Sequence, residues 1–324
     1  MKLIQAPTRE YRTWTTDSRN WSRYQPRGGD IVIATYPKCG TTWMQRIVGL
    51  LIFQDTAPIP LMEVSPWIDR RAEALVEEYF ATLESQRHRR FIKSHLPFDG
   101  LPIFDEVSYI SVARDGRDAL LSWHNFASAF PPEILDRLDH NGLCDESLGR
   151  PFPRPCERPA DEFHRWLTES AMPGGDDGLP NVSFFHHTRS WWEQRERSNV
   201  LLVHFNDLQQ DLSQEMERVA AFLGISTGGT MPALVDAAGF SAMRRDGREL
   251  LSVLADQIDG GHHRFLKDGR NRKWEGAFRQ EDLDLYQMKL RELLSPDCAH
   301  WIQNGGKATD GPPRPVERTD IPGR

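Results

Sequence analysis

Four short runs of apolar and β-branched residues stand out along an otherwise polar chain. They occupy residues 30–35, 91–93, 107–113 and 199–205. Runs of this length without strict polar alternation are typical of strands buried on both faces of a parallel sheet. We therefore expect four buried strands.

Apolar positions recur at helical spacing between these runs. Helices are expected over residues 42–51 with Thr41 as the N-cap, over 73–83, over 118–126, and over about 208–223 with a stop at Gly224. Strands that alternate with helices predict a mostly parallel central sheet with helices on both faces. Because no repeat or flexible linker divides the chain, we expect a single α/β domain over residues 1–303.

Three segments show neither the apolar runs of strands nor the apolar spacing of helices. Residues 131–159 and 172–180 are rich in proline and glycine, which predicts irregular structure. Long loops in a compact domain are usually lids or binding loops. The segment 304–324 contains four prolines and little apolar content, so we expect a mobile tail.

The overall charge narrows the range of partners. Lys and Arg number 40 and Asp and Glu 47, giving a net charge of −7, which is unfavourable for nucleic acid or anionic membranes. No apolar run is long enough to span a bilayer, and the first residues lack the apolar core of a signal peptide. The four cysteines are scattered and form no C-x-x-C pair, which favours free thiols. We expect a cytoplasmic protein.

A phosphate-binding loop is indicated after the first strand, where residues 35–43 read TYPKCGTTW. A helix N-terminus presents unpaired N–H groups and a favourable dipole to an anion. Gly40 allows the backbone to approach a ligand closely, and Lys38 adds a charge. Hydroxyls of Thr41 and Thr42 lie at the first turn. A strand-to-helix turn with incidental polar residues is the alternative.

Two further strand ends carry candidate chemistry. Residues 93–97 read KSHLP, and a histidine such as His95 can accept a proton from a hydroxyl, although a lone histidine is more often structural. Arg114 ends the third strand, where an idle charge is costly, and a guanidinium suits a terminal phosphate. Residues 264–274, RFLKDGRNRKW, add five cations in an acidic chain.

Together these strings resemble motifs of the cytosolic-type sulfotransferases, which use 3′-phosphoadenosine 5′-phosphosulfate (PAPS). Their phosphosulfate loop usually reads TYPKSGTTW, so Cys39 replaces a serine here. KSHLP is similar to the family's K-[TS]-H-[LF]-P. Residues 112–123 resemble the strand, turn and helix that carry an arginine and, eight residues later, a serine. Residues 264–274 match RKGxxGDWK imperfectly, and only Lys267 and Gly269 are carried over. The resemblance covers about residues 28–280.

The resemblance implies transfer of a sulfuryl group from PAPS to the hydroxyl of a small alcohol or phenol by in-line displacement, leaving adenosine 3′,5′-bisphosphate (PAP). It implies catalytic roles for His95 as the base, Lys38 at the leaving oxygen, Lys93 at the sulfuryl group and Ser122 near the 3′-phosphate. It implies donor binding by Lys38, Cys39, Gly40, Thr41, Thr42, Trp43, Arg114, Ser122, Phe205, Phe240, Lys267 and Gly269. Core packing explains Phe205 and Phe240 equally well.

Two other functions stay open. A P-loop kinase or NTPase requires a Walker A spacing and a strand that ends in a magnesium-binding Asp, and we find neither pattern. A non-catalytic nucleotide-binding protein is the second alternative. We expect no metal site, because His186-His187 and His262-His263 lack ligand spacing and read as surface pairs.

The acceptor and the oligomeric state cannot be read from the sequence. Loops between residues 131 and 180 are expected to face the acceptor. Trp67, Phe98, Phe126 and Phe130 are candidates for an apolar acceptor pocket and equally for the core. The short sequence by which animal members of this family usually dimerise is not evident after Trp274, so the oligomeric state stays open.

Overall fold

A four-stranded parallel sheet lies at the centre of the computed structural model, which describes residues 1–252, 258–267 and 269–308. The strand order is β3 (Phe91–Ser94), β2 (Ile31–Ala34), β5 (Ser108–Ala113) and β6 (Val200–His204). Ile31 lies opposite Phe91 on one side and Ser108 on the other, while Tyr109 lies opposite Val200. All four predicted strands are confirmed.

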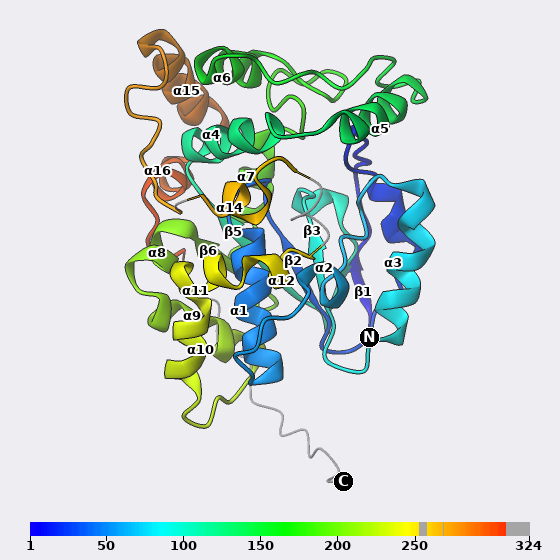
Figure 1. Cartoon of the computed structure of the whole chain (residues 1–324), viewed down its shortest axis with the longest axis vertical. Coiled ribbons are helices and arrows are strands. Elements are labelled where there is room, and N and C mark those ends of the chain that lie inside the picture. The colour runs from blue at the N-terminus through cyan, green and yellow to red at the C-terminus, as the bar shows by residue number, and fades with distance from the viewer. Residues whose placement is uncertain (253–257, 268, 309–324) are drawn as a thin grey trace.

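Helices cover both faces of this sheet, as the alternation predicts (Figure 1). Ile31 and Ile33 pack on the face covered by α1 (Thr41–Phe53), α9 (Leu212–Leu223) and α10 (Met231–Ala238). Val32 and Ala34 point to the opposite core. That core includes residues of α3 (Glu73–Ser85), α4 (Gly116–Ala127), α6 (Pro159–Thr168), α7 (Phe184–Trp192), α15 (Gln280–Leu293) and α16 (Pro296–Asn304).

Three predicted helices differ from the structure, two in the residue where they begin and one because it is broken into two. Thr41 is the first residue of α1 rather than its cap; the cap is Gly40, which has φ 112°. The expected helix over 118–126 begins at Gly116, because the Asp115 side chain accepts a hydrogen bond from the Arg117 N–H. The expected helix over 208–223 is two helices, α8 (Phe205–Gln210) and α9, since Asp211 adopts an extended φ and caps α9 through Gln214 N.

The proline-rich segment 131–159 is partly helical, so its prediction as irregular was wrong. Helix α5 (Pro132–Leu143) has a proline in its first turn, where the missing N–H costs nothing. Residues 144–158 and 172–180 contain neither helix nor strand. Of the predicted tail, residues 309–324 lie outside the described part of the chain.

Short elements complete the described chain, and none of them has a sequence pattern long enough to be predicted. The strands β1 (Leu3–Gln5) and β4 (Ile103–Phe104) form an antiparallel pair. The short helices are η1 (Ser18–Arg23), α2 (Leu61–Val64), η2 (Phe98–Gly100), α11 (Phe240–Arg245), α12 (Gly247–Leu250) and α14 (Gly261–Phe265). Among the described residues, no helix is long and apolar enough to cross a membrane.

The strand order places a crevice at the carboxyl end of β2. From β2 the chain crosses to β3 on one side, and it later returns to β5 on the other. The loops that follow β2 and β5 therefore diverge, and open α/β sheets bind their ligands at such a switch point. The predicted phosphate loop follows β2, and Arg114 follows β5.

Candidate active site

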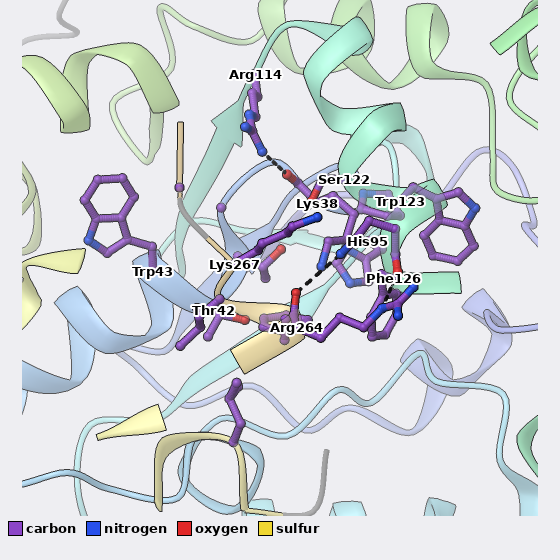
Figure 2. Close-up of a pocket in the computed structure, with 18 of the residues that line it drawn as sticks. Lys38, Thr42, Trp43, His95, Arg114, Ser122, Trp123, Phe126, Arg264 and Lys267 are labelled. Atoms are coloured by element: carbon purple, nitrogen blue, oxygen red, sulfur yellow. Dashed lines mark hydrogen bonds between the residues drawn. The ribbon is translucent and has the colours of Figure 1, made fainter. Parts of the chain in front are cut away.

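A cavity of about 980 Å³ opens at this edge of the sheet. Figure 2 shows Lys38, His95 and Phe126 close together, with Trp43 and Trp123 at opposite sides. Asp118 is the only carboxylate among its described lining residues. The basic lining residues are Lys38, Arg70, Arg71, Lys93, Arg114, Arg137, Arg264, Lys267, Arg270 and Lys273. An acidic chain thus concentrates positive charge in one cavity, which favours anionic ligands.

The loop after β2 has the backbone of an anion cradle. Lys38 has φ 68° and Gly40 φ 112°, both in the left-handed region. A Cβ on Gly40 would lie 3.0 Å from Phe205 Cδ2, so glycine suits this position for space as well as conformation. The N-cap Gly40 has no side chain to cap α1, which leaves the first N–H groups of the helix available at the cavity, beside Thr41 and Thr42.

The Lys38 ammonium lies between two aromatic rings. Its Nζ is 3.8 Å from the centre of the Phe265 ring and 4.4 Å from that of Phe126. Burial, together with the charges of Arg114 and Lys93, lowers the pKa of Lys38 to about 7. Among the described residues, no carboxylate pairs with Lys38. A bound anion would therefore gain from this charge and stabilise it.

Cys39 lies in the loop but its side chain faces the core. The thiol is buried, and burial raises its pKa to about 12. Its N–H donates to the Tyr36 carbonyl at 3.2 Å. The loop therefore holds Cys39 as a small buried side chain rather than as a reactive thiolate.

His95 follows β3 and lines the cavity. Its Nδ1 lies 2.8 Å from the Thr35 carbonyl oxygen. A carbonyl can only accept, so the hydrogen sits on Nδ1 and Nε2 keeps its lone pair. Burial, and next the charge of Lys93, lowers the pKa of His95 well below its usual value. His95 is therefore a neutral imidazole with a free basic nitrogen.

Lys93 and Asp69 flank this histidine. Lys93 Nζ lies 4.5 Å from the centre of the Trp67 ring, and burial lowers its pKa to about 8. The fully buried Asp69 accepts a hydrogen bond from the His95 N–H at 3.3 Å and another from Trp21 Nε1 at 3.3 Å. Burial raises the pKa of Asp69 to about 6. Sequence reasoning missed Asp69, because a single Asp in a loop gives no pattern.

Arg114 ties the end of β5 to two other segments. Its guanidinium lies 4.3 Å from the centre of the Phe205 ring. It donates to the carbonyl of Lys38 at 3.3 Å, to the carbonyl of Arg270 at 3.2 Å, and to Asn271 Oδ1 at 2.8 Å. Figure 2 shows it directed toward the phosphate loop. One buried cation therefore joins the phosphate loop to the basic segment 264–274.

The basic segment 264–274 is held over α4 by a buried carboxylate of that helix. Asp118 is buried and accepts hydrogen bonds from the N–H groups of Arg272 at 2.9 Å and Lys273 at 3.2 Å. Gly269 has φ 62°, and a Cβ there would lie 2.8 Å from Phe240. Ser122 of α4 and the exposed Lys267 also line the cavity, while Asp268 lies outside the described residues.

Three aromatic side chains gather beside the phosphate loop. Trp43 donates to the Ala238 carbonyl at 2.9 Å, and its ring meets that of Phe205 edge-on at 5.2 Å. Phe240 lines the same cavity. Phe205 is 7% exposed and contacts both the loop and the cavity, so it packs in the core and borders the site at once.

The remaining candidates separate into two groups. Trp67, Phe126 and Phe130 line the cavity, whereas Phe98 lies in the core against Trp191. The predicted surface pair at 186–187 is wrong: His187 is buried and His186 Nε2 lies 3.0 Å from Asp99. Within the described residues, no group of three or more His, Cys, Asp or Glu side chains is placed to hold a metal ion.

Comparison with known sequences identifies similar proteins over most of the chain. The profile of a family described as the sulfotransferase domain matches residues 28–296. A glycolipid sulfotransferase of Mycobacterium tuberculosis is 35% identical over 313 residues, covering 93% of this chain and 95% of that protein. Mouse sulfotransferase 1B1 is 25% identical over 295 residues, covering 85% of this chain and 87% of that protein.

Solved structures share the fold. The crystal structure of mouse sulfotransferase SULT7A1 complexed with PAP has a TM-score of 0.64 at 18% identity, covering 88% of this chain and 92% of that chain. Retinol dehydratase in complex with androsterone and inactive cofactor PAP has a TM-score of 0.63 at 20% identity, covering 86% of each chain.

Proposed function

The chain belongs to the sulfotransferase family, and we propose that this enzyme moves a sulfuryl group from PAPS to a hydroxyl of a small-molecule acceptor. One observation carries the proposal. A neutral His95, the open N-terminus of α1, and Lys38, which no carboxylate of the described residues pairs with, line the same cavity. A base and an anion cradle are the two parts that such a transfer requires.

The residues present fit the donor at both of its charged ends. The 5′-phosphosulfate is assigned to Lys38 and the loop from Cys39 to Thr42, where Cys39 contributes as part of the backbone turn. The 3′-phosphate is assigned to Arg114, Ser122, Lys267 and the turn at Gly269. The adenine is assigned to the aromatic group of Trp43, Phe205 and Phe240.

The donor supplies a sulfuryl group whose bond to the departing phosphate oxygen breaks in line as the bond to the acceptor oxygen forms. His95 Nε2 takes the hydroxyl proton, and the hydrogen bond to the Thr35 carbonyl keeps the ring in the correct tautomer. Lys38 stabilises charge on the departing oxygen, and Lys93 positions the sulfuryl group. No metal enters this assignment.

The acceptor is assigned to the part of the cavity beyond His95. Its walls include Trp123, Phe126, Phe130 and Leu138, which suit a molecule with an apolar body. The Mycobacterium relative is named a glycolipid sulfotransferase, and a glycolipid combines an apolar body with hydroxyl groups. We assign the acceptor class as hydroxyl-bearing small molecules, lipids included.

We further propose a cytoplasmic enzyme with no nucleic-acid partner. Its four cysteines are all free, which agrees with a reducing compartment. The net charge of −7 disfavours binding to nucleic acid.

Titration with nucleotides tests the donor assignment. PAP is expected to bind tightly without Mg²⁺, and a preference for Mg-ATP would favour a kinase or NTPase instead. A mass-resolved acceptor screen with PAPS then tests transfer. Products heavier by one sulfuryl group are expected, and PAP binding without transfer to any acceptor would favour a non-catalytic nucleotide-binding protein.

A further inference from the structure

A second group of arginines lines the cavity on the side away from Arg114. Arg70 and Arg71 belong to the segment that runs beside β3, where Trp67 and Lys93 form a parallel β-bridge. Arg137 belongs to α5. Arg114 follows β5, on the other side of β2. The charge of Arg70 lowers the pKa values of both Lys93 and Arg137, so Arg70 lies near both side chains. This second group of arginines and Arg114 therefore lie on opposite sides of His95.

Two of these three arginines have no ion-pair partner among the described residues. Arg71 is compensated by Asp145 at 2.9 Å. Among the described residues, the guanidinium of Arg70 donates only to the Tyr79 hydroxyl, at 3.1 Å. The guanidinium of Arg137 makes no hydrogen bond or ion pair within the described chain, although the residue is half-buried at the cavity wall.

Several carboxylates of the neighbouring elements pair with other cations. Asp145 also pairs with Arg12 at 2.8 Å. On α5, Asp139 pairs with Arg154 at 2.6 Å. On α3, Glu77 pairs with Arg23 at 2.7 Å. None of these carboxylates lines the cavity, and no described carboxylate forms an ion pair with Arg70 or Arg137.

Half-buried cations without counter-charges carry a desolvation cost that a bound anion removes. Arginine presents parallel N–H groups that match the oxygens of a carboxylate, sulfate or phosphate. The donor's own anionic groups are assigned to the opposite side of the cavity. A ligand that reaches Arg70 and Arg137 must therefore supply its own negative charge.

We propose that the acceptor carries an anionic group in addition to its hydroxyl, and that Arg70 and Arg137 bind it. This inference rests on the proposed function. The hydroxyl lies at His95, and an apolar body that packs against Phe130 and Leu138 separates it from the anion. The two arginines therefore determine acceptor specificity and take no part in the chemical step.

Matched acceptor pairs test the proposal. The probes are 4-hydroxyphenylalkanoic acids with one to ten methylene groups, each compared with its neutral methyl ester. Sulfate and phosphate analogues of the best length distinguish the type of anion. Affinity is measured by calorimetry on protein saturated with PAP, so the readout does not depend on turnover. At one chain length or more, the anion should bind roughly 10- to 100-fold more tightly than its ester, as expected for a charged hydrogen-bonded group.

Variants assign the effect to the arginine. Arg137→Gln should remove the preference for the anion and leave ester binding and PAP affinity unchanged, while Arg137→Lys should retain part of it. Arg291→Gln, on an exposed part of α15 that does not line the cavity, is the matched control and should keep the preference. Equal binding of acid and ester at every length would overturn the proposal, and so would an Arg137→Gln protein that keeps the full preference. Anion preference without sulfuryl transfer would instead count against the proposed function.

Discussion

The hydrogen bond to the Thr35 carbonyl fixes the tautomer of His95, and a substitution that keeps this bond tests the proposed role of His95 as general base. His95→Gln keeps a donor for the Thr35 oxygen but lacks a basic nitrogen. We expect kcat to fall by roughly 10²- to 10⁴-fold, the usual contribution of a general base. PAP affinity should stay within about twofold. The measurement is PAP release from PAPS with the best acceptor of the screen, and a kcat within tenfold of wild type would contradict the assignment.

The pKa of Lys38 predicts a pH dependence of donor binding. In the free protein this pKa is about 7, so the ammonium is mostly deprotonated at pH 8. A bound phosphate favours the charged form and raises the pKa, so PAP binding at pH 8 takes up a proton. Affinity should therefore weaken by up to about tenfold per pH unit above pH 7.

Calorimetry in buffers of different ionisation enthalpy measures this proton uptake. About one proton is expected at pH 8, with a further contribution from Lys93, whose pKa is about 8. Lys38→Met should reduce the uptake. Binding enthalpies that are identical in all buffers would show that Lys38 is already charged in the free enzyme.

The sequence predicted the residues of contiguous motifs better than the residues that support them. Lys38, His95 and Arg114 each follow a strand in a recognisable string, and all three line one cavity. Asp118 and Asp69 act through contacts with residues 154 and 26 positions away, respectively. Such contacts exist only once the chain has folded, so no local pattern shows them.

At the scale of elements, the shape of the basic segment 264–274 depends on Gly269, and Gly276 serves as a matched control position. Gly269 and Gly276 both have positive φ, 62° and 77°. A Cβ on Gly269 would lie 2.8 Å from Phe240, whereas one on Gly276 meets nothing within 4 Å. Each alanine variant should lose about 1–2 kcal/mol of stability from backbone strain.

Only Gly269→Ala should weaken PAP binding, by about tenfold, because Phe240 must shift from the cavity wall. Fluorescence titration with PAP and chemical unfolding of both variants provide the comparison. Equal PAP affinities in the two variants would show that the turn at Gly269 does not shape the donor site.

The strands were predictable because each is a continuous apolar run, and both faces of the sheet are indeed covered. Helix α5 was missed because the prolines that flank its segment read as loop signals, although the proline in its first turn is a favourable start. The break between α8 and α9 had a signal, since Asp211 precedes Gln214 by the spacing of a capping box. The periodicity of apolar positions across the break concealed it.

At the scale of the whole molecule, the reactivity of the cysteines can measure how often the fold opens. Cys144 is exposed, whereas Cys298 in α16 is buried and burial raises the pKa of its thiol to about 12. A thiol reagent should therefore label Cys144 at once and Cys298 only when the molecule opens. Cys298 does not line the cavity, so a ligand does not shield it directly.

PAP at about 100 times its Kd should slow labelling of Cys298 by roughly 100-fold if opening is global and fast relative to labelling, because the ligand stabilises the folded state by about 2.7 kcal/mol. Labelling of Cys144 is the internal control and should not change. Mass spectrometry of the labelled peptides measures both rates. An unchanged rate at Cys298 would show that α16 opens independently of the donor site.

The two sides of the cavity are attached to the fold in different ways, and this bears on how the enzyme can diversify. Lys38, His95 and Arg114 follow hydrogen-bonded strands of the central sheet, which fixes their positions. Arg70 and Arg137 stand on a connecting segment and on a peripheral helix. Mutations there can exchange one acceptor for another while the transfer chemistry is inherited intact. A library confined to Arg70, Arg71 and α5 is a direct route from this protein to sulfotransferases of new specificity.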